Sequence, residues 1–336
     1  SNNTAVGYNA LVTNTTGANN TAVGGQGVLD ANTSGSQNTG IGGGALSANT
    51  TASNNTAVGH ASLIRNTTGA GNVAVGTDAL NYNTTADNNT AVGFNALVAN
   101  TTASGNTAVG GNALDANTTG SANTAVGQGA LTDNITGVNN TAVGQGALAN
   151  VLNDGNTAIG LSAGAGISSG QYNTAIGLVS MTTTTYTGSY NSSIGYNAAP
   201  SAAGSSGQFT LGSADISNLR CNDTSISSLS DSRDKTNVIN SPYGLDFINT
   251  VRPVQFEWDT RDGNVKDGST RLGFLAQELL TATNGNNAVL DLVLEENPDK
   301  LEAKYGNLLP IMVKAIQELS AQVTALTTRI TELEGE

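Results

Sequence analysis

The sequence predicts a mostly β protein, in which a long β-solenoid shaft is followed by a small α/β domain and a C-terminal parallel coiled coil. Three observations carry this prediction. The 336 residues include 42 Gly but only 11% charged and 4% aromatic residues, which favours many thin repeated layers over one thick core. An asparagine recurs about every 17 residues up to position 191, and the C-terminal residues carry a heptad pattern.

The repeat occurs in about twelve copies. If its Asn is counted as position one, position four is Val or Ile, position five is Gly, position eight is small and position nine is usually Leu. A stretch such as Thr4 to Gly7 fits a strand and a corner, because it is too short and too Gly-broken for a helix. The opening residues are Asn3, Asn20, Asn38, Asn55, Asn72, Asn89, Asn106, Asn123, Asn140, Asn156, Asn173 and Asn191.

Each copy is therefore predicted to form one coil of a β-solenoid. Stacking at about 4.8 Å would align Val with Val, Leu with Leu and Asn with Asn, over a shaft roughly 55 to 60 Å long. No Pro precedes Pro200, as expected where every backbone N–H is needed in the ladder. Position nine becomes Gly164, Met181 and Ala199 in the last three copies, which predicts a cap or a change of cross-section.

The repeat Asn-Thr-Ala-Val-Gly-x-x-Ala-Leu resembles the Asn-Ser-x-Ala-Ile-Gly repeats in the left-handed β-roll heads of trimeric autotransporter adhesins, and similar repeats in phage tail fibres. The resemblance spans Asn3 to about Ala199, although those heads use a shorter period. It implies a homotrimeric shaft, with small position-eight residues such as Ala45 and Ala79 near the trimer axis.

Charge and composition argue against several kinds of partner. The formal net charge of −13 opposes nucleic-acid binding, because phosphate contacts need clustered Lys and Arg. No stretch approaches the roughly 18 apolar residues of a membrane span, so no membrane insertion is expected.

The single cysteine, Cys221, cannot form an internal disulfide. Gly-rich stretches recur in phase with the coil and lack the Lys of a phosphate loop, so they are interpreted as turns and no cofactor is expected.

Two further shaft features are interpreted structurally. Sequons such as Asn14-Thr15-Thr16 recur with the period, so coil geometry explains them, and glycosylation would in addition require secretion. His60 occupies the variable position six and has no second His or Cys nearby to complete a metal site. A solvent-facing role for His60 is the main interpretation, and a receptor contact is the alternative.

From Arg220 onward the composition becomes that of an ordinary globular domain, with eleven of the twelve basic residues and the only Trp. Four ordered stretches resemble the endosialidase-type intramolecular chaperone, an autoprocessing domain at the end of phage tail spikes and fibres. The first, from Ser230, reads Ser-Asp-Ser-Arg-Asp-Lys-Thr-Asn-Val. The others are Val-Arg-Pro-Val-Gln-Phe-Glu-Trp at 251–258, Gly-Phe-Leu-Ala-Gln-Glu at 273–278, and the start of the final helix at 308–319.

The resemblance implies a domain that trimerises, templates folding of the shaft, and then cuts itself off before the motif's Ser. Here that bond joins Leu229 to Ser230. Leu272 stands where many members of the family carry His, so the implied function is stronger for folding than for cleavage. The site residues implied are Ser230 as nucleophile and Lys235 as base, with Asp231, Arg233 and Asn237 as supporting motif residues.

The chemistry of such a pair sets a condition on the lysine. A Ser hydroxyl is a weak nucleophile and needs a base, and Lys can serve only when neutral. The pKa of Lys235 would have to fall from about 10.4, through burial or a nearby positive charge such as Arg233. Ser230 would then attack the Leu229 carbonyl, giving an ester that water hydrolyses. Ser and Lys five residues apart mean nothing alone, so the prediction rests on the ordered motifs.

The C-terminal residues predict a parallel coiled coil rather than a helix packed only on its own domain. Ile or Val at a with Leu at d ordinarily favours two strands. Three strands are favoured because the Arg329 to Glu334 stretch resembles a trimer signature, in which Arg329 reaches Glu334 of a neighbouring helix. The a positions are Leu309, Ile316, Val323 and Ile330, and the d positions are Met312, Leu319, Leu326 and Leu333.

These features predict a phage tail fibre or spike component of the virion that attaches to the host. Its predicted partners are itself, as a homotrimer, and a host cell-surface receptor, a glycan or a surface protein. Its only chemistry would be one self-cut by a serine peptidase without external substrate, and no metal is expected. The predicted domains are the shaft at 1–205, a connector at 206–229, the chaperone at 230–305 and the coiled-coil helix at 306–336.

Other functions remain as alternatives. One is a bacterial trimeric surface adhesin with the same repeats and an uncleaved chaperone, located at the cell surface. Another is an ice-binding solenoid that uses Thr ladders such as Thr15 and Thr16. A glycan-degrading enzyme is disfavoured, because the shaft contains no Glu and no paired carboxylates, which glycoside hydrolysis generally requires.

Overall fold

The computed structural model describes residues 2–182, 185–213, 216, 220, 230–259 and 268–335. Contacts within the chain divide it into two units, Ser1–Ser213 and Ala214–Glu336. We call the first unit the shaft and the second the C-terminal unit.

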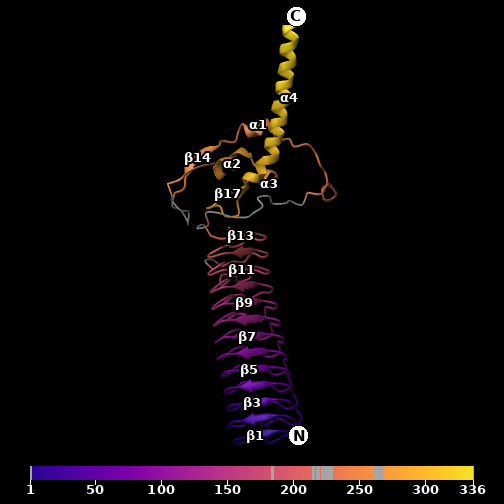
Figure 1. Cartoon of the computed structure of the whole chain (residues 1–336), viewed down its shortest axis with the longest axis vertical. Helices are drawn as coiled ribbons and strands as arrows, with labels where there is room; N and C mark the ends of the chain where they lie inside the picture. Colours follow the sequence, from indigo (N-terminus) through magenta and orange to yellow (C-terminus); the bar gives the residue numbers. More distant parts are fainter. Residues whose placement is uncertain are drawn as a thin grey trace. The chain divides into compact units, whose positions relative to one another are not determined.

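The shaft is a β-solenoid with one three-residue strand in each coil (Figure 1). Its thirteen-stranded sheet is parallel and follows chain order throughout. The predicted ladders are confirmed by the register, in which Val92 pairs with Val109. The strands are β1 (Thr4–Val6), β2 (Thr21–Val23), β3 (Thr39–Ile41), β4 (Thr56–Val58), β5 (Val73–Val75), β6 (Thr90–Val92), β7 (Thr107–Val109), β8 (Thr124–Val126), β9 (Thr141–Val143), β10 (Thr157–Ile159), β11 (Thr174–Ile176), β12 (Ser192–Ile194) and β13 (Phe209–Leu211).

The apolar core of the shaft is closed within a single chain. It consists mainly of the central strand residue, which is Ala in most strands, the small residue at position eight and the Leu at position nine. Ala45 and Ala79 are fully buried in this core. The expectation that position-eight residues lie near a trimer axis is therefore wrong, because the chain's own side chains already surround them.

Leu at position nine adopts an unusual backbone conformation. Leu97 and Leu114, for example, have φ of 53° and 52°, in the left-handed region that costs an L-residue roughly 1–2 kcal/mol. Both side chains are fully buried, and burying a Leu gains about 1.5–3 kcal/mol. Burial thus offsets the backbone cost, coil after coil.

Gly at position five allows successive coils to approach closely. Gly93 has φ of 139°, and a Cβ there would lie 2.5 Å from the carbonyl oxygen of Gly110 in the next coil. No other residue could occupy this place without displacing the backbone. The invariance of position five is therefore a requirement of coil stacking.

The Asn at position one forms a buried ladder along the shaft. The side-chain N–H of Asn106 donates to the Gly120 carbonyl at 3.0 Å. Its Oδ1 accepts the backbone N–H of Asn123, the equivalent residue of the next coil, at 2.9 Å. Each amide thus closes its own coil and also ties it to the next.

A second Asn ladder runs along position twelve. Asn117 donates to the same Gly120 carbonyl at 3.0 Å and to Oδ1 of Asn100 in the preceding coil at 3.2 Å. Asn100 and Asn117 each begin an Asn-Thr-Thr sequon and are fully buried, so in the folded shaft they are structural and inaccessible to modification. A second set of sequons, such as Asn54-Asn55-Thr56, begins instead at exposed residues.

The cross-section changes near the end of the repeats, as predicted. Val151, Ile167 and Tyr186 take the place of the second Asn ladder and are buried. Asn134 is the last amide before this change, and its Oδ1 accepts no hydrogen bond from the described residues. The apolar substitution therefore ends the ladder abruptly.

The C-terminal unit combines short helices with two small antiparallel sheets. Strand β14 (Val254–Glu257) pairs with β15 (Thr270–Gly273), and β16 (Val293–Leu294) pairs with β17 (Glu302–Ala303). Its helices are α1 (Leu245–Ile248), α2 (Ala276–Ala282), α3 (Asn287–Leu290) and α4 (Leu309–Glu334), with 3-10 turns η1 (Ser232–Asp234) and η2 (Tyr305–Leu308). None of the described helices combines the length and apolar character needed to span a membrane.

The Asn ladder gives a first test. Asn106→Ala should lower the free energy of unfolding by roughly 2–4 kcal/mol, because it leaves the Asn123 N–H buried without a partner, at about 1–3 kcal/mol, and removes one of the two hydrogen bonds to the Gly120 carbonyl, at about 1 kcal/mol. Urea unfolding followed by circular dichroism would measure this. The matched control is Gln128→Ala at an exposed position of the next coil, where a change within about 0.5 kcal/mol is expected. Equal effects of the two substitutions would contradict the ladder's role.

Candidate functional site

The predicted site residues lie on a short turn at the start of the C-terminal unit. Asp231 caps η1, because its Oδ1 accepts the Arg233 backbone N–H at 2.9 Å. The same carboxylate binds the Arg233 guanidinium, with Nε–Oδ1 at 3.0 Å and a second nitrogen at 2.5 Å from Oδ2. Two of the three supporting motif residues thus act on each other and fix the turn.

This turn brings the two predicted catalytic side chains together. Lys235 follows η1 in an extended conformation, and its Nζ donates a hydrogen bond to Ser230 Oγ at 2.6 Å. Both residues are exposed in the single chain. The spacing of five residues, which had no meaning as sequence alone, is therefore the span of one capped 3-10 turn.

The electrostatics of the turn differ from the sequence-based expectation. The guanidinium of Arg233, through its side-chain hydrogen bonds, lowers the pKa of Asp231, and the backbone N–H of Arg233 adds to this effect. Asp231 in turn raises the pKa of Arg233. The charge of Arg233 is thus balanced by its own partner, and Lys235 is exposed in one chain.

The remaining residues named in the sequence analysis are described by their conformation, exposure or position in the chain. Asn237 adopts the left-handed conformation, with φ of 54°. Leu272 lies in β15 with its side chain 81% exposed. Leu229, on the other side of the predicted cleavage bond, lies outside the described residues. Within the described part of the chain, no group of three His, Cys, Asp or Glu residues is arranged as metal ligands would be.

An ion pair joins two of the sequence motifs in space. Arg252, from the segment before β14, binds Glu278 of α2, with Nε 2.9 Å from Oε2. This hydrogen-bonded pair lowers the pKa of Glu278. The motifs at 251–258 and 273–278 are therefore neighbours, although nothing in the sequence indicated which of their residues would meet.

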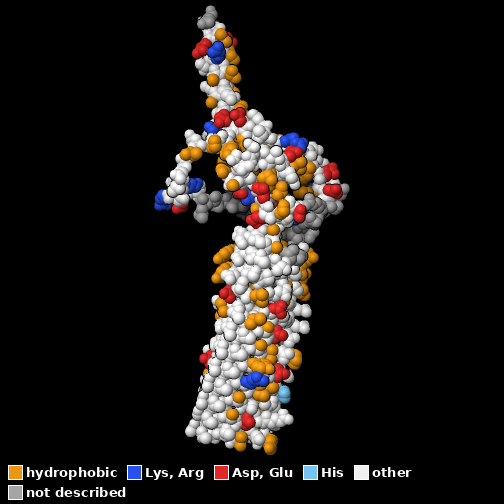
Figure 2. Space-filling view, turned by 180° about the vertical axis from the view of Figure 1, so that it is seen from behind, with side chains coloured by type: hydrophobic (Ala, Val, Ile, Leu, Met, Phe, Trp, Pro, Cys, Tyr) orange, Lys and Arg blue, Asp and Glu red, His pale blue; other side chains and the backbone are white. Residues whose placement is uncertain are grey.

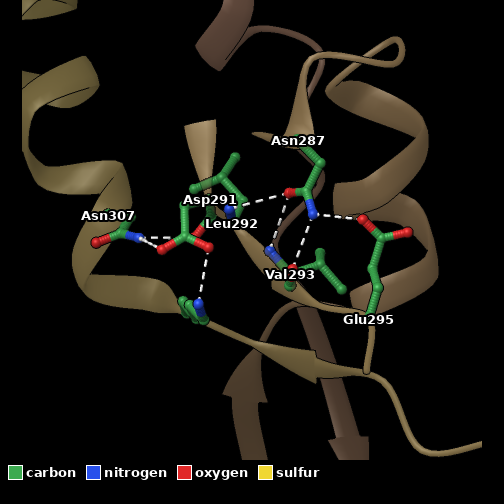
Figure 3. A network of polar contacts seen from close by, with 7 residues as sticks. Asn287, Asp291, Leu292, Val293, Glu295 and Asn307 are labelled. Carbon is green, nitrogen blue, oxygen red and sulfur yellow. Dashed lines mark hydrogen bonds and ion pairs between the residues drawn. The ribbon is translucent and has the colours of Figure 1, made fainter. Parts of the chain in front are cut away.

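A polar network fixes the loop between α3 and β16 (Figure 3). Asn287 accepts the backbone N–H groups of Leu292 and Val293, both at 3.1 Å, and donates to the Val293 carbonyl. Asp291 binds the Lys304 ammonium at 2.7 Å and the side chain of Asn307. Sequence reasoning missed this network, because single Asn and Asp residues in a loop carry no periodic signal.

The segment that begins at Ser230 is of a recognised type. Residues 230–290 match the family model described as chaperone of endosialidase. The match begins at the serine that Lys235 contacts and covers three of the four motifs, but not the shaft. A β-solenoid shaft of about twelve coils followed by this chaperone domain fits a tail fibre with a C-terminal chaperone. No curated protein sequence matches the chain.

Helix α4 packs on the chaperone domain with one side only. Ile311 and Ala315 are buried, and Ile311 joins Leu279, Leu290 and Leu308 in the domain core. These positions differ from the heptad stripe predicted for trimerisation. Every residue of that stripe is exposed: Leu309, Met312, Ile316, Leu319, Val323, Leu326, Ile330 and Leu333, together with Arg329 and Glu334. The alternative of a helix packed on its own domain thus explains the first turns but leaves the heptad stripe without a partner among the residues that the structure describes.

Glu318 fastens α1 to α4. Its carboxylate accepts the Leu245 N–H at 2.7 Å and lies 3.3 Å from Lys314 Nζ. The hydrogen bond from Leu245 is the main reason why the pKa of Glu318 is lowered, and Lys314 adds to it. The carboxylate therefore supplies the acceptor for a helix start that has no cap of its own.

This contact predicts an acid-sensitive contribution to stability. Because the folded-state pKa of Glu318 lies below the ordinary value of about 4.3, the contribution is complete above that pH and is lost as the pH falls through the folded-state pKa. Glu318→Gln should therefore make the C-terminal unit less sensitive to acid. Urea midpoints followed by Trp258 fluorescence, compared between about pH 6 and about pH 3.5, would show it. Glu332→Gln, at an exposed site of the same helix, should leave the pH dependence unchanged, and an equal response of both variants would refute the assignment.

Proposed function

We propose that the protein is a trimeric tail fibre or spike component of a phage virion that serves in host attachment. Its chaperone domain aligns three chains, promotes folding of the shaft and then cleaves the Leu229–Ser230 bond. The observation that carries this proposal is the coincidence at Ser230, where the chaperone match begins and where Lys235 Nζ lies 2.6 Å from the hydroxyl. The virion location and attachment to a host receptor, a glycan or a surface protein, follow from the fibre-like combination of shaft and chaperone.

Trimerisation is supported by the unpartnered stripe of α4. Ile316 and Leu326 are each 63% exposed, and such a stripe of large apolar residues at a and d positions is stable in water only when covered by other helices. Parallel helices would also place the same residue of each chain at the same height. Arg329 at g and Glu334 at e can then pair between neighbours, which supports three strands.

The proposed cut needs a neutral Lys235 and proceeds in two steps. The amine takes the proton of the Ser230 hydroxyl while Oγ attacks the Leu229 carbonyl carbon. The resulting ammonium returns this proton to the peptide nitrogen, so that the C–N bond breaks and the nitrogen leaves as the amino group of Ser230. The ester that results joins Leu229 to Ser230 Oγ. Water then hydrolyses it to a Leu229 carboxylate and a free Ser230 hydroxyl. Because Lys235 is exposed in one chain, we place its desolvation in the assembled trimer, so that cleavage follows assembly.

The cut can be tested by mass. Wild-type protein should yield two fragments, 1–229 and 230–336, whereas Ser230→Ala and Lys235→Met should remain intact, because the first lacks the nucleophile and the second the base. Mass spectrometry of the incubated proteins measures this. Ser232→Ala, two residues from the nucleophile in the same turn, should still be cut. An intact wild-type chain would refute the proposed self-cleavage and favour the alternative of a surface adhesin with an uncleaved chaperone.

Assembly can be tested separately on the α4 stripe. Leu326→Glu places a charge at a d position and should convert the trimer to monomers, because three carboxylates cannot share a coiled-coil core without partners. Sedimentation velocity measures the mass in solution. Thr328→Glu, at the outward f position of the same turn, should leave the trimer intact. If cleavage follows assembly, Leu326→Glu should also remain uncut; a monomeric wild type would refute the trimer.

A further inference from the structure

The outer face of the shaft's sheet is an unbroken pair of ladders. In each strand the central residue points inward and the two flanking residues point outward, at positions two and four of the repeat. Position two is Thr in most coils and position four is Val or Ile in all twelve. The position-four side chains are exposed in seven coils, for example 36% in Val109 and 43% in Ile159, and half-buried in the other five. We call this surface the Thr/Val face.

The Thr/Val face carries no charge in any of the thirteen strands. The ionisable residues of the shaft that the structure describes all lie outside the strands, and the view in Figure 2 shows acidic side chains and one basic patch on a face of the shaft. They are Asp30, His60, Arg65, Asp78, Asp87, Asp115, Asp133 and Asp154. At β13 the face becomes fully apolar in its outward residues, Phe209 and Leu211, which are 65% and 48% exposed.

The shaft interior leaves no place for a second chain. Its Ala and Leu ladders are buried within one chain, and both Asn ladders are saturated along most of their length by their own coils. Chains can therefore meet only through outer surfaces. A surface of β-branched side chains without charge is the one from which water is removed at least cost.

We propose that the Thr/Val face is the surface through which the shafts of identical chains pack side by side in the trimer. This inference rests on the proposed trimer and deepens it. A second copy fits this face better than any other occupant, because parallel chains held in register by α4 present the same ladder at the same spacing. The axis-facing positions are then two and four, instead of position eight.

The size of the face explains why it would need the helix. Thirteen strands about 4.8 Å apart give the face a length of about 60 Å. Its width is the length of a three-residue strand, about 10 Å, so its area is roughly 600 Å² per chain. A stable interface between free proteins buries about 800 Å² per partner. The face alone is thus too small, but a coiled coil that tethers the chains raises their effective concentration to the millimolar range and makes weak lateral contacts sufficient.

The test places charge on the face and measures how close the shafts lie. Val109→Lys with Val126→Lys, in adjacent coils, should separate the shafts of the full-length protein. Thr102→Lys with Thr119→Lys is the matched control, because it adds the same charge to the same part of the shaft at exposed positions of another face. Each protein would carry Ser230→Ala, so that the helix stays attached, together with Cys221→Ser and a spin label at Gln145→Cys, an exposed position next to the ladder.

Dipolar spectroscopy then reports the distances between labels in different chains. Wild type and control should show a narrow, short-distance component, and the Val109 and Val126 variant should lose it while remaining trimeric by sedimentation and folded by circular dichroism. A trimer whose label distances are the same in all three proteins would overturn this inference and leave the trimer standing. A wild type that sediments as a monomer would overturn both.

Discussion

The hydrogen bonds of the position-one asparagines are the interaction on which the shaft depends. Each buried amide, such as that of Asn106, satisfies a carbonyl of its own coil and an N–H of the next. A strand of three residues is far too short to be stable alone, and a polar group buried without a partner is costly. Coils are therefore stable only as a stack, in which each coil contributes one strand to the sheet and one Asn hydrogen bond to the next coil.

Because the shaft core is complete within one chain, the shaft and the C-terminal unit have different roles in the proposed trimer. Because the core closes within a chain, the shaft does not need partner strands for its own fold. Because its coils are nearly identical, however, it cannot specify how three shafts align, since a shift by one whole coil would match Val with Val again. The exposed stripe of α4 is less uniform, because Met312 and Val323 each occur in it only once. In the proposed trimer it is therefore the helix that determines the register and the shaft that follows.

The repeat made much of this fold predictable, and the limits of prediction are physical. The period, the ladders and the altered last coils could be predicted from the side chains alone, because residues equivalent to Gly93, Val92 and Asn106 recur in every coil in the same environment. The closed single-chain core did not follow, since an Ala such as Ala45 is equally suited to a core or to a trimer axis. In the site, the motif predicted that Ser230 and Lys235 would be paired, but not that Asp231 would neutralise Arg233, because that depends on the conformation of one turn.

The pairing of Arg233 with Asp231 bears on when the proposed cut could occur. If Arg233 were unpaired beside Lys235, its field would favour the neutral amine in every chain, folded or not, and the chaperone could leave before its work was done. In one chain, however, Asp231 balances this charge and Lys235 is exposed. In the proposed trimer, burial of Lys235 by neighbouring chains would provide the base only after alignment. Cleavage would then remove the chaperone and its helix, without which separated shafts could not find their alignment again. The fibre would therefore persist because its dissociation is slow, and not because its lateral contacts are strong.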